Sequence, residues 1–449
     1  MSKQPPEQPE TVDTIINARW IIPVVPANQV LTDHSLIIHN GKIKDILPTA
    51  EARAAYEAGE VISCDTHLLI PGLVNSHTHA AMNLMRGIAD DLPLHTWLEE
   101  HIWPTEHEHM SAEFVAAGSR LAIAEMIRTG TTCFADMYFF PDVTAAIAEE
   151  AGMRAVIGLI VIDFPNAWAA TPADHLRLGL HLHDEYISSP LISTQFAPHA
   201  PYTVSDEWLT QVAILAEELD VPFQIHLHET AEEVEQSLAR FNMRPLERIS
   251  QLGMLSPRLQ AVHATQLMKG EIGSLAKHGA SVVHCPQSNM KLASGSCQVA
   301  DLLAAGVNVT LGTDSAASNN NLNMVDEMRS AGLLGKHIAG DAAALPAHTL
   351  LEMATINGAR ALGLEDKIGS LEIGKAADIT AVDLNSLSTV PVYDPLSALI
   401  YASSRENITD VWVAGERLLK EGELLTLHAP SLIRQAAEWR RLLQSRTTG

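Results

Sequence analysis

Leu68-Leu-Ile-Pro-Gly-Leu-Val-Asn-Ser-His77-Thr-His79 is the stretch that decides the fold, because it reads as a buried strand ending in two imidazoles. In a strand, residues i and i+2 point to the same face, so His77 and His79 should project together where the strand ends. Two convergent imidazoles make up half of a typical zinc site. We therefore expect a strand at Leu68–His77 that delivers two metal ligands.

Three later β-rich runs also end in histidines or acids. They are Phe223-Gln-Ile-His226-Leu-His228-Glu229, Ala261-Val-His263 and Val307-Asn-Val-Thr-Leu-Gly-Thr-Asp314. A parallel (β/α)8 barrel gathers catalytic groups from the ends of several strands at one face. The alternative, several satisfied core histidines and a capping aspartate, does not explain why all of them occupy that end. The pattern favours the barrel.

Between Leu68 and about Leu364, strand-like runs alternate with helical stretches, which predicts parallel β/α units. Helices are expected over Ala112–Arg128, Ser205–Glu218 and Thr349–Leu362, and the first and last of these are amphipathic at helical spacing. The eight predicted strands are Leu68–His77, Thr131–Asp136, Arg154–Ile162, Ile192–Ala197, Phe223–His228, Leu259–His263, Ser281–Cys285 and Asn308–Gly312.

Both ends of the chain carry separate β signals. Short β runs fill Thr14–Ile70, with a hairpin turn expected at Asn40-Gly41, and β runs return at Gly374–Asp383 and Thr409–Leu419. Pairing the two ends would protect their strand edges. The predicted fold class is thus α/β, a (β/α)8 TIM barrel with a composite β-sandwich. The predicted domains are 1–67 and 366–449 for the sandwich, the latter with a terminal helix, and 68–365 for the barrel.

Composition narrows the function classes. The 449 residues carry a formal net charge of -25, which argues against nucleic acid and favours a neutral or cationic small substrate. The four cysteines form no Cys-x-x-Cys pair, which is typical of a reduced compartment. The polar, proline-rich first ten residues read as an irregular tail rather than a signal peptide, and no apolar run is long enough to span a membrane. We expect a cytoplasmic protein.

Together, His77, His79, His226 and Asp314 can be interpreted as ligands of one divalent ion. Three imidazoles and a carboxylate suit Zn²⁺, one per subunit, although ligand type alone also admits Fe²⁺. Such an ion would lower the pKa of water to about 7, and Asp314 could accept the released proton. His263 could orient the attacking water, and Glu229, just beyond the strand, could protonate a ring nitrogen of a heteroaromatic substrate.

Several motifs resemble the amidohydrolase superfamily, and the resemblance covers about Asp13 to Gly422. It is closest to the deaminases of 5'-methylthioadenosine and S-adenosylhomocysteine, a family with a single zinc in a distorted barrel. The motifs that carry it are His77-Thr-His79, His226 with Glu229, His263, Gly312-Thr-Asp314-Ser-Ala-Ala-Ser-Asn-Asn, Trp103-Pro-Thr-Glu106, Ala197-Pro-His199-Ala-Pro-Tyr202 and Ser288-Asn-Met-Lys-Leu292.

That resemblance implies further roles at matching positions. Glu106 would bind the two ribose hydroxyls, His199 would contact the sugar end, and Glu229 and Asp314 would contact the base. Trp97 is well placed to stack on the base or simply to pack. From the residues alone, Glu106 could equally be a solvated helix acid and His199 a loop cap.

One departure from the family pattern concerns the substrate tail. Deaminases of S-adenosylhomocysteine pair its carboxylate with an arginine near the third strand, whereas Ala155–Ile162 offers none after Arg154. This favours an apolar methylthio tail, with either Trp168 or the pair Leu84 and Met85 as candidate walls of its pocket. Arg177 could still reach a carboxylate from a loop.

The sequence therefore predicts a zinc-dependent aminohydrolase that converts 5'-methylthioadenosine to 5'-methylthioinosine and ammonia. S-adenosylhomocysteine and adenosine are the expected weaker substrates, and a homodimer is the expected assembly. An alternative within the superfamily is a triazine, guanine or cytosine amino- or chlorohydrolase. A third interpretation is a non-catalytic scaffold like the dihydropyrimidinase-related proteins.

Overall fold

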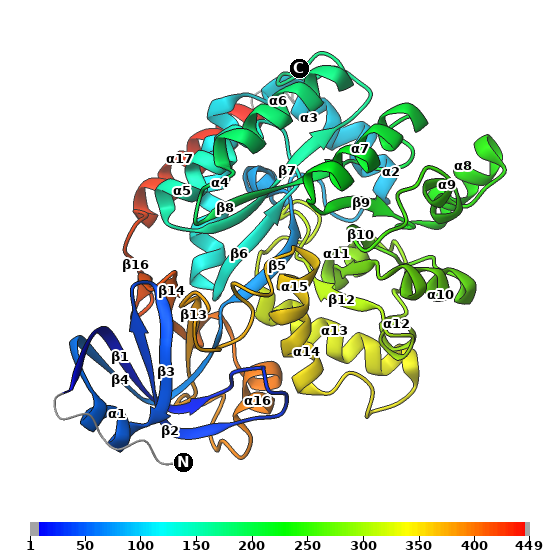
Figure 1. Ribbon diagram of the computed structural model, residues 1–449. Coiled ribbons are helices and arrows are strands. Elements are labelled where there is room, and N and C mark those ends of the chain that lie inside the picture. Colours follow the sequence, from blue (N-terminus) through cyan, green and yellow to red (C-terminus); the bar gives the residue numbers. More distant parts are fainter. Residues whose placement is uncertain (1–8, 445–449) are drawn as a thin grey trace.

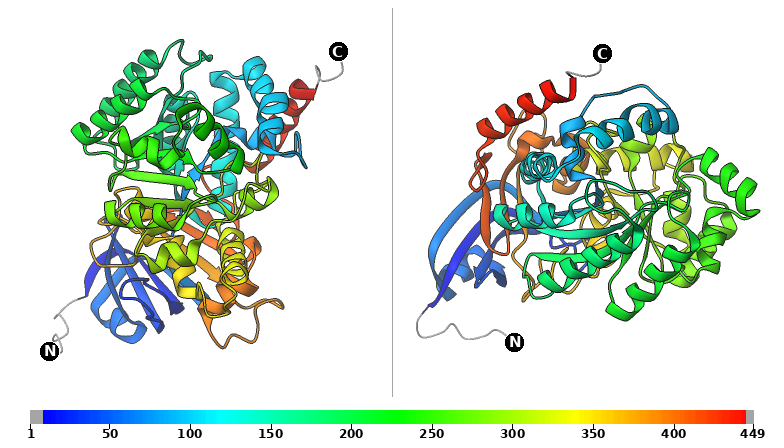
Figure 2. Two further views of the ribbon diagram at one scale, coloured as in Figure 1. Left: turned by 90° about the vertical axis from the view of Figure 1, so that its right-hand side faces the viewer. Right: turned by 90° about the horizontal axis from the view of Figure 1, so that it is seen from above.

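The computed structural model describes residues 9–444, so most of the expected N-terminal tail lies outside it. Within that range the strands form two eight-stranded sheets (Figure 1). One is the parallel barrel, and the other joins both ends of the chain beside the barrel's base, where the blue and orange segments lie together in Figure 2. The predicted fold class is confirmed.

Parallel pairing links the barrel strands in chain order from β5 to β12. Seven of the eight predicted strands begin where expected and end within one residue of the prediction. The strands are β5 (Leu73–Thr78), β6 (Thr131–Asp136), β7 (Arg154–Val161), β8 (Ile192–Pro198), β9 (Phe223–Leu227), β10 (Leu259–His263), β11 (Ser281–His284) and β12 (Asn308–Leu311).

Helices cover the outside of the barrel, and four short elements lie between β5 and α4. Those four are η1 (Ala80–Met85), α2 (Leu94–Trp97), η2 (Leu98–Ile102) and α3 (Trp103–His109). The remaining helices of this part are α4 (Ala112–Arg128), α5 (Pro141–Ala151), α6 (Pro172–Tyr186), α7 (Asp206–Leu219), α8 (Ala231–Phe241), α9 (Pro245–Gln251), α10 (Lys269–His278), α11 (Pro286–Lys291), α12 (Val299–Ala304), α13 (Met324–Ala339), α14 (Ala347–Met353) and α15 (Ile356–Ala361).

Side chains close the barrel where its first and last strands meet. Asn75 on β5 makes two hydrogen bonds with Thr313. Its Nδ2 donates to the hydroxyl of Thr313 (2.7 Å), and its Oδ1 accepts from the amide N–H of Thr313 (3.0 Å). The amide of Asp314 donates to the carbonyl of His77 at 3.0 Å. Gly312 permits this approach, because a Cβ there would lie 2.9 Å from the Cβ of His77. The seam thus brings Asp314 beside the two histidines of β5.

The second sheet is built from both chain ends, as predicted. β4 pairs antiparallel with β13, and β1 pairs parallel with β4. The β2–β3 hairpin turns at Asn40 and Gly41, both with positive φ. Its elements are β1 (Glu10–Ile21), β2 (Leu31–His39), β3 (Lys42–Pro48), α1 (Thr49–Ala55), β4 (Tyr56–Pro71), β13 (Ile379–Asp383), β14 (Ile408–Val413), β15 (Glu416–Lys420) and β16 (Glu423–Leu424).

This sheet folds over a core of its own. Ile16 and Leu36 from the N-terminal strands share one apolar cluster with Ile379 and Trp412 from the C-terminal strands. Downstream of β13 come α16 (Pro395–Ser397), η3 (Ala398–Ala402) and η4 (Arg405–Asn407), and the chain ends with α17 (Ala429–Gln444), the red helix that lies against α4 (Figure 1).

Two predicted elements are divided in the structure. The run Leu68–His77 is not one strand, because Leu68–Pro71 completes β4 of the second sheet and β5 begins at Leu73. The expected helix Thr349–Leu362 is two helices, α14 and α15, because the carbonyl of Ala354 accepts the amide of Val74 on β5. The domain boundaries 67 and 365 stay predictions.

A buried ion pair joins the second sheet to the barrel. Arg154 at the start of β7 donates through Nε (2.8 Å) and Nη2 (3.1 Å) to the carboxylate of Asp378 beside β13. Its Nη1 also donates to the carbonyl of Pro190. Because it lies at the base of the barrel, Arg154 faces away from the C-terminal strand ends.

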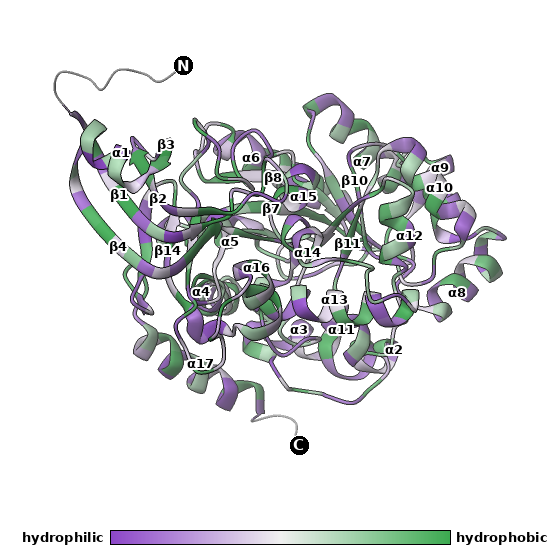
Figure 3. Cartoon of the chain, turned by 90° about the horizontal axis from the view of Figure 1, so that it is seen from below, coloured by the Kyte–Doolittle hydropathy of each residue, from purple (hydrophilic) through white to green (hydrophobic). Residues whose placement is uncertain are grey.

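The outer helices alternate apolar and polar residues, as the green and purple bands on α8 and α10 show (Figure 3). The apolar face of α10 packs into the barrel core, whereas α8 packs against α9. Over residues 9–444, no helix has the length and apolar character needed to cross a membrane.

Candidate active site

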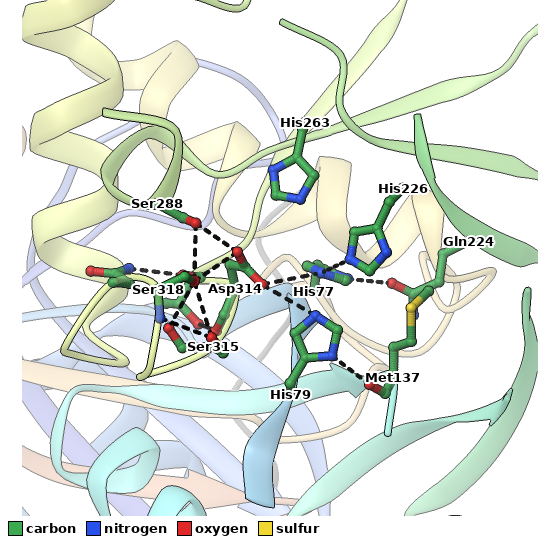
Figure 4. Close-up of polar contacts among 12 residues, drawn as sticks. His77, His79, Met137, Gln224, His226, His263, Ser288, Asp314, Ser315 and Ser318 are labelled. Carbon is green, nitrogen blue, oxygen red and sulfur yellow. Dashed lines mark hydrogen bonds and ion pairs between the residues drawn. The ribbon is translucent and has the colours of Figure 1, made fainter. Parts of the chain in front are cut away.

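Four potential metal ligands converge at the C-terminal end of the barrel (Figure 4). His77 and His79 come from the end of β5, His226 from β9 and Asp314 from the loop after β12. One ligand atom from each lies within 4.8 Å of all the others. Oδ1 of Asp314 lies 3.2 Å from Nε2 of His79 and 3.5 Å from Nε2 of His77. Strands distant in sequence thus supply one compact donor set.

Hydrogen bonds on the far side of each ring fix which nitrogen faces the centre. Nδ1 of His79 donates to the carbonyl of Met137 (2.5 Å), and Nδ1 of His226 donates to the carbonyl of His199 (2.8 Å). Nδ1 of His77 donates to Oε1 of Gln224 (2.6 Å). A neutral imidazole carries one N–H, so in its neutral form each ring presents a lone pair on Nε2 to the centre.

These lone pairs face one another at short range. Nε2 of His77 and Nε2 of His226 lie 3.2 Å apart, and burial lowers the pKa of His77 to about 4, so its ring is neutral. Lone pairs and a carboxylate so close together repel unless a cation lies between them. Three imidazole nitrogens and one carboxylate oxygen are the donor set that Zn²⁺ prefers. The described residues therefore fit a divalent metal ion.

The carboxylate of Asp314 is held from behind. Its Oδ2 accepts hydrogen bonds from the hydroxyls of Ser288 (2.6 Å) and Ser318 (2.8 Å), which leaves Oδ1 facing the imidazoles (Figure 4). Asp314 also adopts a left-handed backbone conformation, with φ 59°, that turns its side chain inward from the end of β12. Local strain and two hydroxyl donors thus fix the direction of this group.

Glu229 and His263 lie next to the metal-ligand cluster. Nδ1 of His263 donates to Oδ1 of Asn289 at 2.8 Å, so its Nε2 is free to accept a proton. This Nε2 lies 3.7 Å from Oε2 of Glu229. Burial, followed by the charge of Asp314, raises the pKa of Glu229 to about 8. Burial lowers the pKa of His263, so a neutral carboxylic acid and a neutral imidazole lie side by side.

A pocket opens onto this centre, with about 750 Å³ of space when its open mouth is included. Glu106, His199 and Trp97 all line it, as do Glu229, His263 and Asp314. The phenol of Tyr138 donates to Oε1 of Glu106 at 2.6 Å. Burial raises the pKa of Glu106 to about 7, while this hydrogen bond and His79 oppose the increase. Burial lowers the pKa of His199 to about 3, so its ring is neutral.

The segment between β5 and α4 covers the pocket, and apolar side chains form much of its wall. Leu94, Trp97, Leu98, Ile102 and Trp103 come from the cover. Facing them, β6, β7 and the loops that follow contribute Met137, Phe139, Ile160, Ile162 and Phe164. Among the pocket-lining residues in the described chain, none is lysine or arginine.

The sequence-based account of the tail pocket needs correction. The indole N–H of Trp168 donates to Oδ1 of Asp142, and its ring packs against the apolar cluster that contains Ile160. Neither Trp168 nor Leu84 nor Met85 lines the pocket. Arg177 is exposed on α6 and pairs with Asp174. With Arg154 buried at the base, neither arginine named in the sequence argument lines the pocket.

Sequence reasoning also missed residues that support the site. Ser288 stands in a motif that the resemblance included, but its contact with Asp314 was not foreseen. Gln224 has a strand-pattern signal, since it precedes His226 by two residues and shares its face. Ser318 likewise stands in the quoted motif that begins at Gly312, but its contact with Asp314 was not foreseen. Tyr138 and Glu233 gave no signal, because their contacts depend on how the loops after the strands fold.

A (β/α)8 barrel with a His₃Asp donor cluster at its strand ends defines the class of metal-dependent hydrolases. The amidohydrolase family model matches residues 68–418. A 5-methylthioadenosine/S-adenosylhomocysteine deaminase of Teredinibacter turnerae is 51% identical over 96% of this chain and 98% of that relative. The chain therefore belongs to the amidohydrolase family.

Solved structures extend this comparison. The crystal structure of an adenosine deaminase from Xanthomonas campestris with bound zinc has a TM-score of 0.97 and 49% identity, over 98% of this chain and 100% of that one. The atrazine chlorohydrolase of Arthrobacter aurescens has a TM-score of 0.87 at 24% identity, over 95% and 100%. That second likeness concerns the fold alone.

Proposed function

We propose that this protein is a zinc-dependent hydrolytic deaminase of adenine nucleosides, with 5'-methylthioadenosine as its preferred substrate. Water and the nucleoside would give 5'-methylthioinosine and ammonia. The names of the relatives support the substrate class. The observation that carries the proposal is the convergence of three imidazole nitrogens and Oδ1 of Asp314 beside Glu229, whose pKa is raised to about 8.

In this proposal His77, His79, His226 and Asp314 hold the zinc. When bound, zinc supplies the Lewis acidity that makes water nucleophilic near neutral pH. Asp314 is close enough to take the proton of the attacking water, since its Oδ1 faces the cluster. Nε2 of His263 accepts a hydrogen bond from that water and directs it toward the ring.

Glu229 is proposed as the acid that protonates N1 of the adenine ring. Attack at C6 pushes electron density onto N1, so a proton delivered there stabilises the transition state. A carboxyl with a pKa of about 8 still carries this proton at neutral pH. Proton return to the amino group, by way of Asp314 and His263, then lets ammonia leave.

Glu106 and His199 are proposed to bind the sugar, and Trp97 to lie against the base. Oε1 of Glu106 is already engaged by Tyr138, which orients the carboxylate toward the pocket. An ionised carboxylate can accept hydrogen bonds from two vicinal hydroxyls. A ribose-bearing substrate uses this group, whereas a bare base or a triazine does not.

The preference for a methylthio tail rests on the lining of the pocket rather than on Arg154. The walls that the tail would meet are apolar, and the pocket offers no cation to a carboxylate. Arg240 lies in the adjoining hollow beyond Trp103 and Tyr202. A carboxylate buried without a cationic partner is costly, so S-adenosylhomocysteine should bind less well.

The test is a side-by-side assay of zinc-loaded protein with 5'-methylthioadenosine, S-adenosylhomocysteine and adenosine, followed by the ultraviolet change from adenine to hypoxanthine. We expect the highest kcat/KM with 5'-methylthioadenosine. Equal efficiency with S-adenosylhomocysteine would overturn the tail preference alone. No turnover of any of the three would overturn nucleoside deamination.

A Glu106→Ala variant distinguishes this function from hydrolysis of a triazine or a free base. We expect a large loss of kcat/KM with a ribonucleoside and little change with a bare heterocycle. A matched control is Glu108→Ala on the same helix. Loss of zinc from Glu106→Ala would instead show that Glu106 acts on the metal site.

A cytoplasmic location and a homodimer complete the proposal. All four cysteines are unpaired and buried in the described structure, which is typical of a reducing compartment. Light scattering on the purified protein tests the dimer, and a monomeric mass at micromolar concentration would contradict it.

A further inference from the structure

The backbone that carries Glu229 is held from both sides. His228 follows β9 with φ 54°, a conformation that turns the chain out of the strand ladder. The amide N–H of His228 donates to Oε1 of Glu233 (3.0 Å), and that of Glu229 donates to Oε2 of the same carboxylate (2.7 Å). One buried side chain therefore takes two successive amides.

The carbonyls of the same two residues are held by the end of β10. The amide of Thr265 donates to the carbonyl of His228 at 3.0 Å, and the hydroxyl of Thr265 donates to the carbonyl of Glu229 at 2.6 Å. All four backbone groups of His228 and Glu229 are thus satisfied. Glu233 holds the two N–H groups and Thr265 holds the two carbonyls.

Glu233 does more than cap its own helix. The N-cap residue of α8 is Thr230, whose hydroxyl accepts the amide of Glu233. In a capping box the acid would return to the amide of Thr230 itself. Here its oxygens reach one and two residues further back, to Glu229 and His228.

The side chain of Glu229, in contrast, is loosely held. Among the described residues, its carboxylate accepts one hydrogen bond, from the hydroxyl of Ser294 at 3.4 Å, and Nε2 of His263 lies 3.7 Å away. Such weak contacts do not by themselves set the direction of the carboxyl. Its position must come from the backbone.

We propose that Glu233, with Thr265 opposite it, is a positioning residue that aims the carboxyl of Glu229 at the reacting ring. The inference rests on the proposed function, in which Glu229 is the acid. Catalytic groups must be placed to within about 1 Å, because a displacement of that size can lower the rate about 100-fold. Glu233 reaches no substrate atom in this proposal and acts only through Glu229.

The test compares Glu233→Gln, Glu229→Gln and the double variant. An amide at position 233 keeps the shape but turns an NH₂ group toward one of the two N–H donors. We expect Glu233→Gln to lower kcat by roughly 10- to 100-fold. KM for 5'-methylthioadenosine, zinc content and Tm should change little. Glu235→Gln, an exposed acid on the same helix, is the matched control and should retain wild-type kcat.

The double variant separates positioning from a merely structural role. If Glu233 acts through Glu229, adding Glu233→Gln to Glu229→Gln should lower kcat by less than about twofold. If Glu233→Gln lowers kcat by the same factor in the Glu229→Gln background as in the wild type, the proposal is overturned. Wild-type kcat in Glu233→Gln would also overturn it.

Two further outcomes have defined meanings. If Glu229→Gln retains wild-type kcat, the proposed acid role fails, and the positioning role fails with it. If Glu233→Gln does not fold, Thr265→Val replaces it, since it removes the hydroxyl bond to the carbonyl of Glu229 from the opposite side. Thr265→Val should lower kcat by a similar factor in the wild-type protein. It should cause little further loss when Glu229→Gln is already present.

Discussion

Glu229 owes its proposed role to where it lies. It is 6% exposed and close to a second carboxylate, Asp314, so burial and like charge both disfavour its ionised form. Glu232 and Glu235 on α8, three and six residues further along the chain, are exposed and have no such surroundings. The same residue type therefore serves as an acid in one place and as a solvated charge in another.

The pKa of Glu229 predicts how activity depends on pH. Because this pKa is raised to about 8, the protonated acid is present below that pH and is lost as pH rises through it. A nearby cation favours the carboxylate, so zinc would move the decline to lower pH. We expect kcat for 5'-methylthioadenosine to fall with rising pH at or below about 8, measured with zinc content monitored throughout. A kcat that still increases above pH 9 would contradict this.

Removing one support of Asp314 should weaken metal binding. Ser288→Ala deletes the 2.6 Å hydrogen bond to Oδ2, and loss of such outer contacts typically reduces metal affinity by about 10- to 100-fold. Competition with a zinc chelator measures the effect. Ser274→Ala, which deletes a hydroxyl that bonds only within α10, should leave the affinity unchanged. Equal affinity in both variants would show that Ser318 alone suffices.

At the scale of elements, the sequence pattern predicted the bounds of a strand correctly where the whole apolar run belongs to one sheet. β6 and β10 match their predicted bounds, and every residue of both strands is buried. The run from Leu68 was misread because both halves are apolar, and only their partners, β13 and β6, distinguish them. The break between α14 and α15 depends on Val74, about 280 residues away in sequence. Local pattern cannot contain that information.

The Arg154–Asp378 pair should matter for stability rather than for catalysis. Arg154→Met leaves a buried carboxylate without its guanidinium, which typically costs about 3–5 kcal/mol. We expect a lower free energy of unfolding in denaturant but unchanged KM in the folded enzyme. The control is Arg177→Met, in which the lost guanidinium is exposed and stability should change little. A raised KM for S-adenosylhomocysteine alone in Arg154→Met would instead support a role in the tail pocket.

At the scale of the whole molecule, the proposed zinc site ties together strands from three parts of the barrel. Removing zinc with a chelator should therefore lower Tm as well as abolish activity, and adding zinc should restore both. Stabilisation by a ligand grows with its concentration, to about 2.7 kcal/mol at 100 times Kd. A calorimetric series over zinc concentration checks this. An unchanged Tm would mean that the ligands are held equally well without the ion.

Much of the candidate site could be predicted because its ligands end strands that are easy to recognise. His77, His226 and Asp314 each follow an apolar run, and the rule that barrel strands share one functional end brings them together. The walls of the tail pocket could not be predicted in this way. Phe139 and Phe164 lie in loops, and which loop side chains face the pocket depends on packing such as the contact of Phe164 with Trp103.

The seam between β5 and β12 has a consequence for how the chain is made. The first two donor residues emerge from the ribosome more than two hundred residues before Asp314. Until β12 docks through Asn75 and Thr313, a nascent chain has imidazoles but no carboxylate opposite them. A product truncated before Asp314 therefore lacks one of the four ligands. Only chains that are complete and have closed the barrel should bind zinc tightly.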